Sequence, residues 1–218
     1  MRNKFDQELD NLNLDIIKMG SMIEQAISMA ITVLKKQNKE MATMAIENDV
    51  SINEMTRLIE SKCLKLLLHQ QPVAKDLRLI STALKIITDM ERIGDNAADI
   101  SEIFLEMSDE EYIKKLEHIP QMGDLAVKMV RLSIDAFVKR DLVIAEMAID
   151  LDDEVDNLFN IVKNDLIDLI IKDKSNTDQA IDLLLISKYL EKIGDHAENI
   201  AEWVIFSITG EHKHMRII

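Results

Sequence analysis

The chain has 218 residues, a formal net charge of −14, five glycines, two prolines and 4% aromatic residues. That length can bury a sizeable core, and the composition favours long helices over sheets. The strong negative charge disfavours nucleic acid and anionic membrane surfaces as partners.

A single cysteine, Cys63, excludes an intramolecular disulfide and fits a reducing compartment. No apolar run approaches the roughly 20 residues that a bilayer-spanning helix needs. The first ten residues lack the apolar core of a signal peptide. We therefore expect a cytoplasmic protein without direct membrane insertion.

Helix breakers divide the chain into six expected helices. In chain order they cover residues 6–37, 39–70, about 72–107, 120–139, 141–172 and 177–208. Pro72 suits the first turn of the third helix, and the polar run 108–111 opens a connector that ends near Pro120. The turns are short, so neighbouring helices are expected to be antiparallel.

A repeat relates the two halves of the chain. Residues 89–102, DMERIGDNAADISE, return as YLEKIGDHAENIAE at 189–202. The identities include Gly94/Gly194, although a mid-helix glycine costs ~1 kcal/mol relative to alanine. We therefore predict an all-α fold of two tandem three-helix bundles, residues 1–108 and 109–218, each with a functional site.

Apolar residues at alternating steps of four and three mark the core side of two helices. In the third helix they are Leu79, Ala83, Ile86, Met90, Ile93, Ala97, Ile100 and Phe104. In the sixth they begin at Gln179, the single polar member, and continue through Leu183, Ile186, Leu190, Ile193, Ala197, Ile200 and Val204.

Acidic residues occupy a second side of the same helices, within an arc of about 80°. A solvated acidic face is the simplest interpretation, but three features argue against it. Carboxylates stack at i,i+4, which destabilises a helix; Lys85 and Arg92 are expected to point elsewhere; and Gly94 and Gly194 lie between the arc and the apolar line, where another helix could approach closely.

The second and fifth helices offer oxygen atoms to face these acids. Matching Ala45-Ile46 with Ala148-Ile149 makes Asp49 equivalent to Asp152, and Asn53 to Asp156. Clustered carboxylates on facing helices suit a divalent or trivalent metal ion, either Mg²⁺, Mn²⁺, iron or zinc. The predicted ligands are Asp49, Asn53, Glu91, Asp95, Asp99, Asp152, Asp156, Glu191, Asp195 and Asn199.

The sequence resembles the PhoU family of phosphate-signalling regulators. The similarity rests on Gln70-Gln71-Pro72, on Asp76-Leu77-Arg78, and on the segments 90–97 and 190–197. It implies two three-helix repeats with metal-binding E/D-x-x-x-D motifs at Glu91/Asp95, Glu191/Asp195 and Asp152/Asp156. Asp49/Asn53 departs by one amide, so the first-half site should be poorer in charge.

The resemblance also implies a role. Family members are negative regulators that couple a phosphate ABC transporter to a sensor histidine kinase, and they are often homodimers. We therefore expect a regulatory adaptor rather than an enzyme. Two alternatives stay open from the residues: a di-metal phosphohydrolase, and a helical scaffold that binds no metal.

Overall fold

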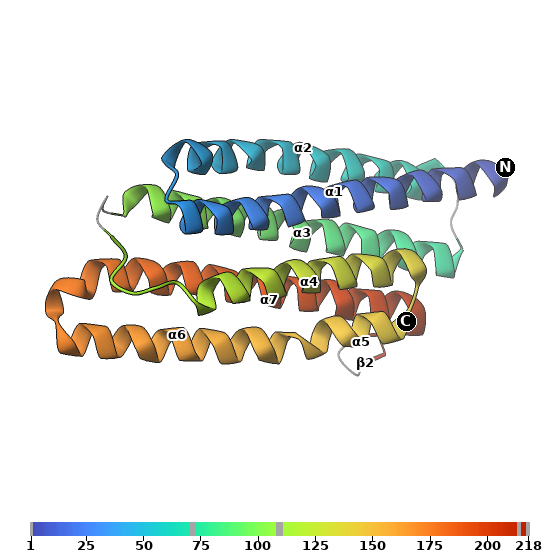
Figure 1. The fold of residues 1–218 in the computed structure, drawn as a ribbon. Coiled ribbons are helices and arrows are strands. Elements are labelled where there is room, and N and C mark those ends of the chain that lie inside the picture. The colour runs from blue at the N-terminus through green and yellow to red at the C-terminus, as the bar shows by residue number, and fades with distance from the viewer. Residues whose placement is uncertain (1, 70–72, 108–110, 213–214, 217–218) are drawn as a thin grey trace.

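The computed structural model describes residues 2–69, 73–107, 111–212 and 215–216 (Figure 1). Its long helices are α1 (Arg2–Lys36), α2 (Lys39–His69), α3 (Ala74–Glu106), α4 (His118–Lys139), α6 (Asp152–Lys172) and α7 (Thr177–Thr209). The expected roles of residues 70–72 and of residues 108–110 lie outside the described chain.

The prediction of one continuous helix over 141–172 is wrong. This segment forms a short α5 (Leu142–Asp150) and then α6, with Leu151 between them. The first turn of α6 carries three acids, Asp152, Asp153 and Glu154. Acidic residues are favoured where a helix begins, because the N-terminal backbone amides carry partial positive charge. The break therefore places Asp152 at a helix N-terminus.

The predicted pair of three-helix bundles is confirmed, and the two bundles share one core. α3 and α7 make the most extensive helix–helix contact, and α1 also packs against α4. Figure 1 shows α2 and α6 on opposite sides of the molecule, with α3 and α7 between them. The two helices that carry the repeated motif therefore lie at the centre.

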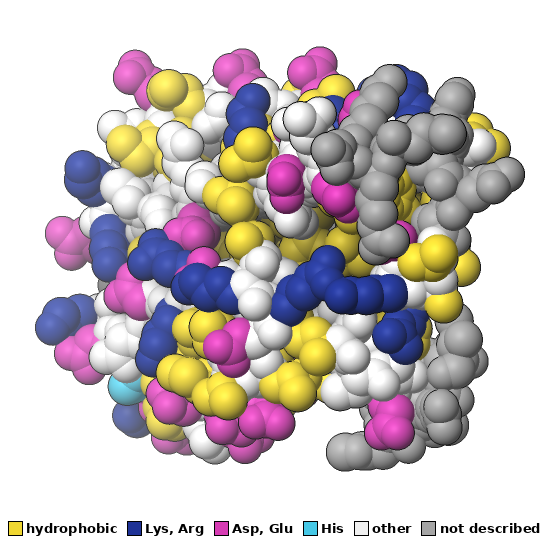
Figure 2. All heavy atoms as spheres, turned by 90° about the vertical axis from the view of Figure 1, so that its right-hand side faces the viewer, with side chains coloured by type: hydrophobic (Ala, Val, Ile, Leu, Met, Phe, Trp, Pro, Cys, Tyr) yellow, Lys and Arg dark blue, Asp and Glu magenta, His cyan; other side chains and the backbone are white. Residues whose placement is uncertain are grey.

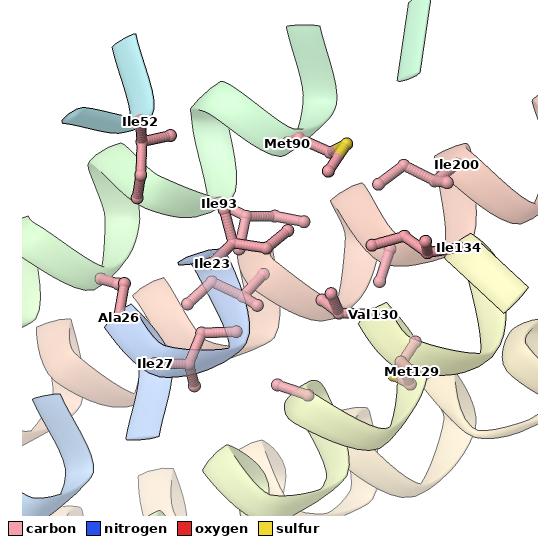
Figure 3. Packing of buried hydrophobic residues seen from close by; sticks show 14 of the residues in the cluster. Ile23, Ala26, Ile27, Ile52, Met90, Ile93, Met129, Val130, Ile134 and Ile200 are labelled. Atoms are coloured by element: carbon pink, nitrogen blue, oxygen red, sulfur yellow. The ribbon is translucent and has the colours of Figure 1, made fainter. Parts of the chain in front are cut away.

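Apolar residues from both halves meet in this core. Figure 3 shows Ile23 and Ile27 of α1 near Ile93 of α3, with Val130 of α4 and Ile200 of α7 close by. Every apolar residue predicted for the core lines of α3 and α7 is buried.

The connector before α4 is tied to both halves. The backbone amide of Ile113 donates to Oε1 of Gln179 at 2.6 Å, and the Tyr112 hydroxyl donates to the carbonyl of Leu34 at 2.9 Å. Gln179 is the polar member of the α7 core line, and its side chain accepts the hydrogen bond that the Ile113 amide of the connector needs. These bonds fix one half relative to the other.

Short elements precede and follow α7. A 3₁₀ turn (Lys174–Asn176) joins α6 to α7, and after α7 the strands β1 (Glu211–His212) and β2 (Met215–Arg216) pair antiparallel. The sequence did not predict these strands.

Contrary to the expectation that no apolar segment is long enough to span a bilayer, α1 meets the length and composition criterion. By length and composition, Phe5–Lys36 is the one described stretch that could cross a bilayer, and half of its most apolar window is buried in the bundle. A core helix of a water-soluble protein meets the same criterion. α1 has such a position, packed against α2, α3 and α4.

Candidate metal centres

In the first half, Asp49 of α2 lies against Gly94 of α3. A β-carbon built on Gly94 would lie 3.4 Å from Asp49 Oδ1, and 3.0 Å from Cδ1 of Ile52. The absence of a side chain at Gly94 therefore lets α2 bring its carboxylate close to the acidic side of α3. This is the close approach that the repeated glycine suggested.

Asp49 is held in a partly desolvated position. The Asn53 amide donates from Nδ2 to Asp49 Oδ2 at 2.6 Å, while Asp49 Oδ1 and Asn53 Oδ1 are buried and accept no hydrogen bond. Burial raises the pKa of Asp49, and the charges of Asp95, Glu91 and Asp99 raise it further, whereas the Asn53 bond lowers it. The two residues present two uncompensated oxygen atoms.

An open hollow of about 410 Å³ lies beside this pair. Its acidic lining comes from Asp49, Asp95, Asp99 and Glu102, and its other lining residues include Tyr189 and Lys192 of α7. The Tyr189 hydroxyl donates a hydrogen bond to Asp99 and lowers the pKa of that carboxyl, although burial has the larger, raising effect. A helix of the second repeat therefore completes the first-half cluster, which the sequence did not predict.

In the second half, Asp152 takes the place of Asp49. Its Oδ1 lies 3.0 Å from the position of a β-carbon on Gly194, and this oxygen is buried without a hydrogen-bond partner. Burial raises the pKa of Asp152 to about 7, with further contributions from the charges of Glu198, Asp195, Asp156 and Glu191. The carboxylate is costly to ionise here unless a cation compensates it.

Glu198 is a residue that the sequence analysis missed. It is the largest electrostatic contributor to the Asp152 pKa, ahead of the predicted Asp195. The repeat concealed it because the first half has Ala98 at the equivalent position. Its spacing of seven residues from Glu191, two helical turns, would have placed it on the acidic arc.

The other predicted second-half ligands differ in their exposure and in their effect on the Asp152 pKa. Asp156 is exposed on α6 and still adds its charge to the Asp152 site. Asn199, a neutral residue, is half-buried one turn beyond Asp195 and is not among the groups that shift the Asp152 pKa. The charges of Asp156, Glu191, Asp195 and Glu198 therefore all act on Asp152, whereas Asn199 adds none.

The expectation that Arg92 points away from the acids is wrong, and in the second half a lysine also contacts an acid. Arg92 Nη1 lies 3.3 Å from Asp95 Oδ2, and Lys188 Nζ contacts both carboxylate oxygens of Glu191. Each pair is separated by three residues on one helix, a spacing that places side chains side by side. Lys85, the other basic residue considered, lies over the Trp203 ring.

The donor set fits a hard cation. Within the described ranges, no three Asp, Glu, His or Cys side chains already converge as a ligand set. Like-charged carboxylates repel one another, and the buried oxygens of Asp49, Asn53 and Asp152 have no hydrogen-bond partner among the described residues. Such atoms need a partner, and carboxylate and amide oxygens are the ligands that Mg²⁺ and Mn²⁺ prefer.

Comparison with protein families identifies the repeat. The PhoU domain matches the chain twice, at residues 16–104 and 119–204. The chain belongs to the PhoU family. Each matched copy contains one of the two acidic clusters and one of the two motif glycines.

Curated relatives in the PhoU family align over nearly the whole chain. A Clostridium acetobutylicum protein named "Phosphate-specific transport system accessory protein PhoU homolog" is 38% identical and covers 96% of both chains. The Aquifex aeolicus protein of the same name is 34% identical and covers 98% of both.

Solved PhoU structures have the same fold. PhoU from Pseudomonas aeruginosa superposes with a TM-score of 0.90 at 30% identity, covering 95% of this chain and 100% of that one. The phosphate transport system regulatory protein PhoU from Streptococcus pneumoniae gives 0.89 at 28% identity, covering 95% and 98%.

Proposed function

We propose that this protein is a cytoplasmic, metal-binding accessory protein of a phosphate-specific transport system that restrains phosphate uptake and the phosphate-starvation response. The transport role is supported by the names of its full-length relatives. The metal is supported chiefly by one observation, the buried and unpaired Asp152 oxygen among four further carboxylates.

Each repeat would hold its own metal through residues from two packed helices. In the first half the ligands would come from Asp49 and Asn53 of α2 and Glu91, Asp95 and Asp99 of α3. In the second half they would come from Asp152 and Asp156 of α6 and Glu191, Asp195 and Glu198 of α7. A bound cation supplies positive charge that offsets the repulsion within each cluster.

The regulatory step would be docking rather than chemistry. Metal binding would fix α2 against α3 and α6 against α7, and so set the outer surfaces that the bundle presents. Those surfaces carry exposed apolar residues, including Met44, Val50 and Leu58 on α2 and Ile161 and Ile167 on α6. Exposed apolar side chains on a helix suit contact with another protein or a second copy of the chain.

The partners in this proposal are a phosphate ABC transporter and its sensor histidine kinase, with a homodimer as the working assembly. Binding to the first would report phosphate uptake, and binding to the second would restrain signalling while phosphate is plentiful. No enzymatic step is proposed, and a phosphatase assay of metal-loaded protein tests that choice. Turnover abolished by Asp152→Asn would favour the di-metal hydrolase instead.

Gene deletion in the host organism tests the regulatory role. Loss of the protein should leave phosphate-starvation genes expressed in phosphate-rich medium, and the wild-type chain should silence them again. A folded Glu91→Gln, Asp95→Asn, Glu191→Gln, Asp195→Asn variant should fail to restore silencing. Normal silencing by that variant would show that metal is dispensable, and unchanged expression in the deletion strain would refute the regulatory role.

Metal analysis tests the sites directly. Elemental analysis and calorimetry should find less metal in a Glu191→Gln, Asp195→Asn variant, with the first-half site retained.

In protein stripped of metal, Mg²⁺ or Mn²⁺ should raise the melting temperature more than sodium chloride at equal ionic strength. Both salts screen the charges, but only a specifically bound cation also stabilises the folded state. Equal effects of the two salts would leave screening as the whole explanation.

A further inference from the structure

One end of this acidic protein carries a concentration of positive charge. Figure 2 shows Lys and Arg side chains in a nearly continuous row across the end where α3 begins and α7 ends. The same end of the molecule has a hollow of about 260 Å³, lined by Lys75, Arg78 and Leu79 of α3, Arg140 after α4, and Ser207 and Ile208 of α7. Three cations from two repeats therefore share one hollow in a chain of net charge −14.

We propose that this hollow binds a tetrahedral oxyanion, either inorganic phosphate or the phosphoryl group of a larger ligand. Arg78 supplies the first argument. Its side chain is half-buried, and its Nε is buried without a hydrogen-bond partner in the part of the chain that the structure describes. A guanidinium presents its N–H groups in a planar fork that matches phosphate oxygens, so an unpaired buried Nε beside a hollow is a donor that lacks its acceptor.

The backbone supplies further donors. α3 begins at Ala74, and its N-cap residue, Val73, provides no side-chain cap. The first amides of a helix have no acceptor within the helix and favour an anion. Because Lys75 and Arg78 lie in this first turn and a half, their charges and the helix terminus act on the same place.

Two acids lie near these cations. Asp76 is in the first turn of α3, and Asp141 follows Arg140. The Asp141 carboxylate is engaged as the N-cap of α5, where its Oδ1 accepts from Val143 N at 2.9 Å and Ile144 N at 3.2 Å. Among the described residues, neither acid lines the hollow, and its lining there holds three cations and no acid.

A structural role for the cations is the competing interpretation. The last turn of α7 has no basic residue of its own, and cations at a helix C-terminus are favourable. Ser207 already donates to the carbonyl of Val204 at 2.8 Å. If the cations only compensate the end of α7, removing them would lower stability and leave the response to anions unchanged.

This anion site is separate from the proposed metal centres. Along α3, Arg78 and Asp95 are seventeen residues apart, or about 25 Å at 1.5 Å per residue. The site goes beyond the accessory role proposed above, because it would let the protein itself respond to a phosphorylated or phosphate ligand.

Calorimetric titration with inorganic phosphate tests the proposal, in chelator and at constant ionic strength. The chelator prevents a bound cation from drawing phosphate to the acidic clusters. Wild-type protein should bind phosphate, and a Lys75→Gln, Arg140→Asn variant should bind at least ~10-fold more weakly. Asparagine suits position 140 because Arg140 has φ 53°. Arg78→Lys, which keeps the charge and loses the fork, should also weaken binding.

Arg57→Gln is the matched control, because it removes one exposed charge from α2. It should bind phosphate like the wild type. Competition with adenosine triphosphate shows whether the ligand is free phosphate or a nucleotide phosphoryl group. If the nucleotide binds more tightly and phosphate displaces it, the hollow is assigned to the phosphoryl group of a nucleotide. If phosphate binds more tightly, the hollow is assigned to the free anion. The absence of phosphate binding by the wild type, or equal binding by the Lys75→Gln, Arg140→Asn variant, would overturn the proposal. Because no metal is present, neither result bears on the metal centres.

Discussion

The carboxylate of Asp152 lies against Gly194, with Oδ1 only 3.0 Å from the position that a β-carbon on this glycine would occupy. In the first repeat the nearest atom to the same position on Gly94 is an apolar one, Cδ1 of Ile52. The two glycines admit different neighbours, so equal substitutions at the two positions should have different consequences.

Gly194→Ala should weaken metal binding in the second half, because the added methyl group displaces the Asp152 carboxylate. An alanine in an exposed helix would instead add up to ~1 kcal/mol of stability. Gly94→Ala should displace mainly Ile52, and so lower the free energy of unfolding with a smaller loss of metal. Calorimetry with Mn²⁺ and thermal melts separate the two effects. A more stable Gly194→Ala protein with full metal content would show that the glycine has no role in the site.

The stability of metal-free protein should fall as the pH rises from about 4 to about 7. The ordinary pKa of 3.8 for Asp152 becomes about 7 in the folded protein. Between these values the folded state holds a proton that the unfolded state has released, so raising the pH favours unfolding. Asp152→Asn should remove the contribution of this group, which we expect to be on the order of 1–2 kcal/mol after solvent screening, and leave a shallower slope from Asp49 and Asp99, whose pKa values are also raised.

Urea denaturation of stripped protein at several pH values measures this effect. Asp153→Asn is the control, because Asp153 is exposed in the same first turn of α6. It should keep the pH slope of the wild type. Metal affinity should have the opposite pH dependence. A proton and a cation compete for the Asp152 oxygens, so the affinity for metal should rise with pH up to about pH 7. A slope as steep in Asp152→Asn as in the wild type would assign the pH dependence to other groups.

Helix periodicity was sufficient to predict most of the fold. The alternating spacing of Leu79 to Phe104 and of Leu183 to Val204 identified the buried sides of α3 and α7, because only one side of each helix faces the core. The spacing could not show that these two sides pack against each other. Nor could it show the break at Leu151, because Asp152 was interpreted only as a ligand and the three acids of the first turn of α6 were not recognised as a helix start.

The candidate site was predictable where the repeat preserved it. Matching Ala45-Ile46 with Ala148-Ile149 pointed to Asp49 and Asp152, which the structure places against Gly94 and Gly194. Glu198 was not predicted because its counterpart in the first repeat is Ala98. Tyr189 was not predicted because it belongs to the other repeat and acts on Asp99 across the contact between them. Contacts between distant segments leave no periodic signal, so comparison of the two halves could not find them.

Glu198→Ala should make the second metal centre resemble the first. It removes the carboxylate with the largest electrostatic effect on Asp152 and restores the residue found at Ala98. We expect Mn²⁺ to bind the second half roughly 10-fold more weakly, consistent with the loss of about 1.4 kcal/mol from one charged ligand. Glu154→Ala, an exposed acid on α6, controls for the change in net charge. Equal losses in the two variants would mean that Glu198 acts only through overall charge.

Tyr189→Phe should affect the metal centre of the repeat to which it does not belong. Burial raises the pKa of Asp99, and the Tyr189 hydroxyl, which donates to this carboxyl across the α3–α7 contact, offsets part of that rise. Without this bond the Asp99 pKa should rise further, so protons should compete better with metal in the first half. The variant should therefore lose first-half affinity more strongly at pH 5.5 than at pH 7.5.

The pH dependence distinguishes this electrostatic effect from a packing defect. Phenylalanine keeps the ring and removes only the hydroxyl, and a general loosening of the α3–α7 contact would weaken both centres at both pH values. Calorimetry in a Glu191→Gln, Asp195→Asn background isolates the first-half site. Unchanged affinity at pH 5.5 would show that the cross-repeat bond does not tune Asp99, and the first centre would then depend on its own repeat alone.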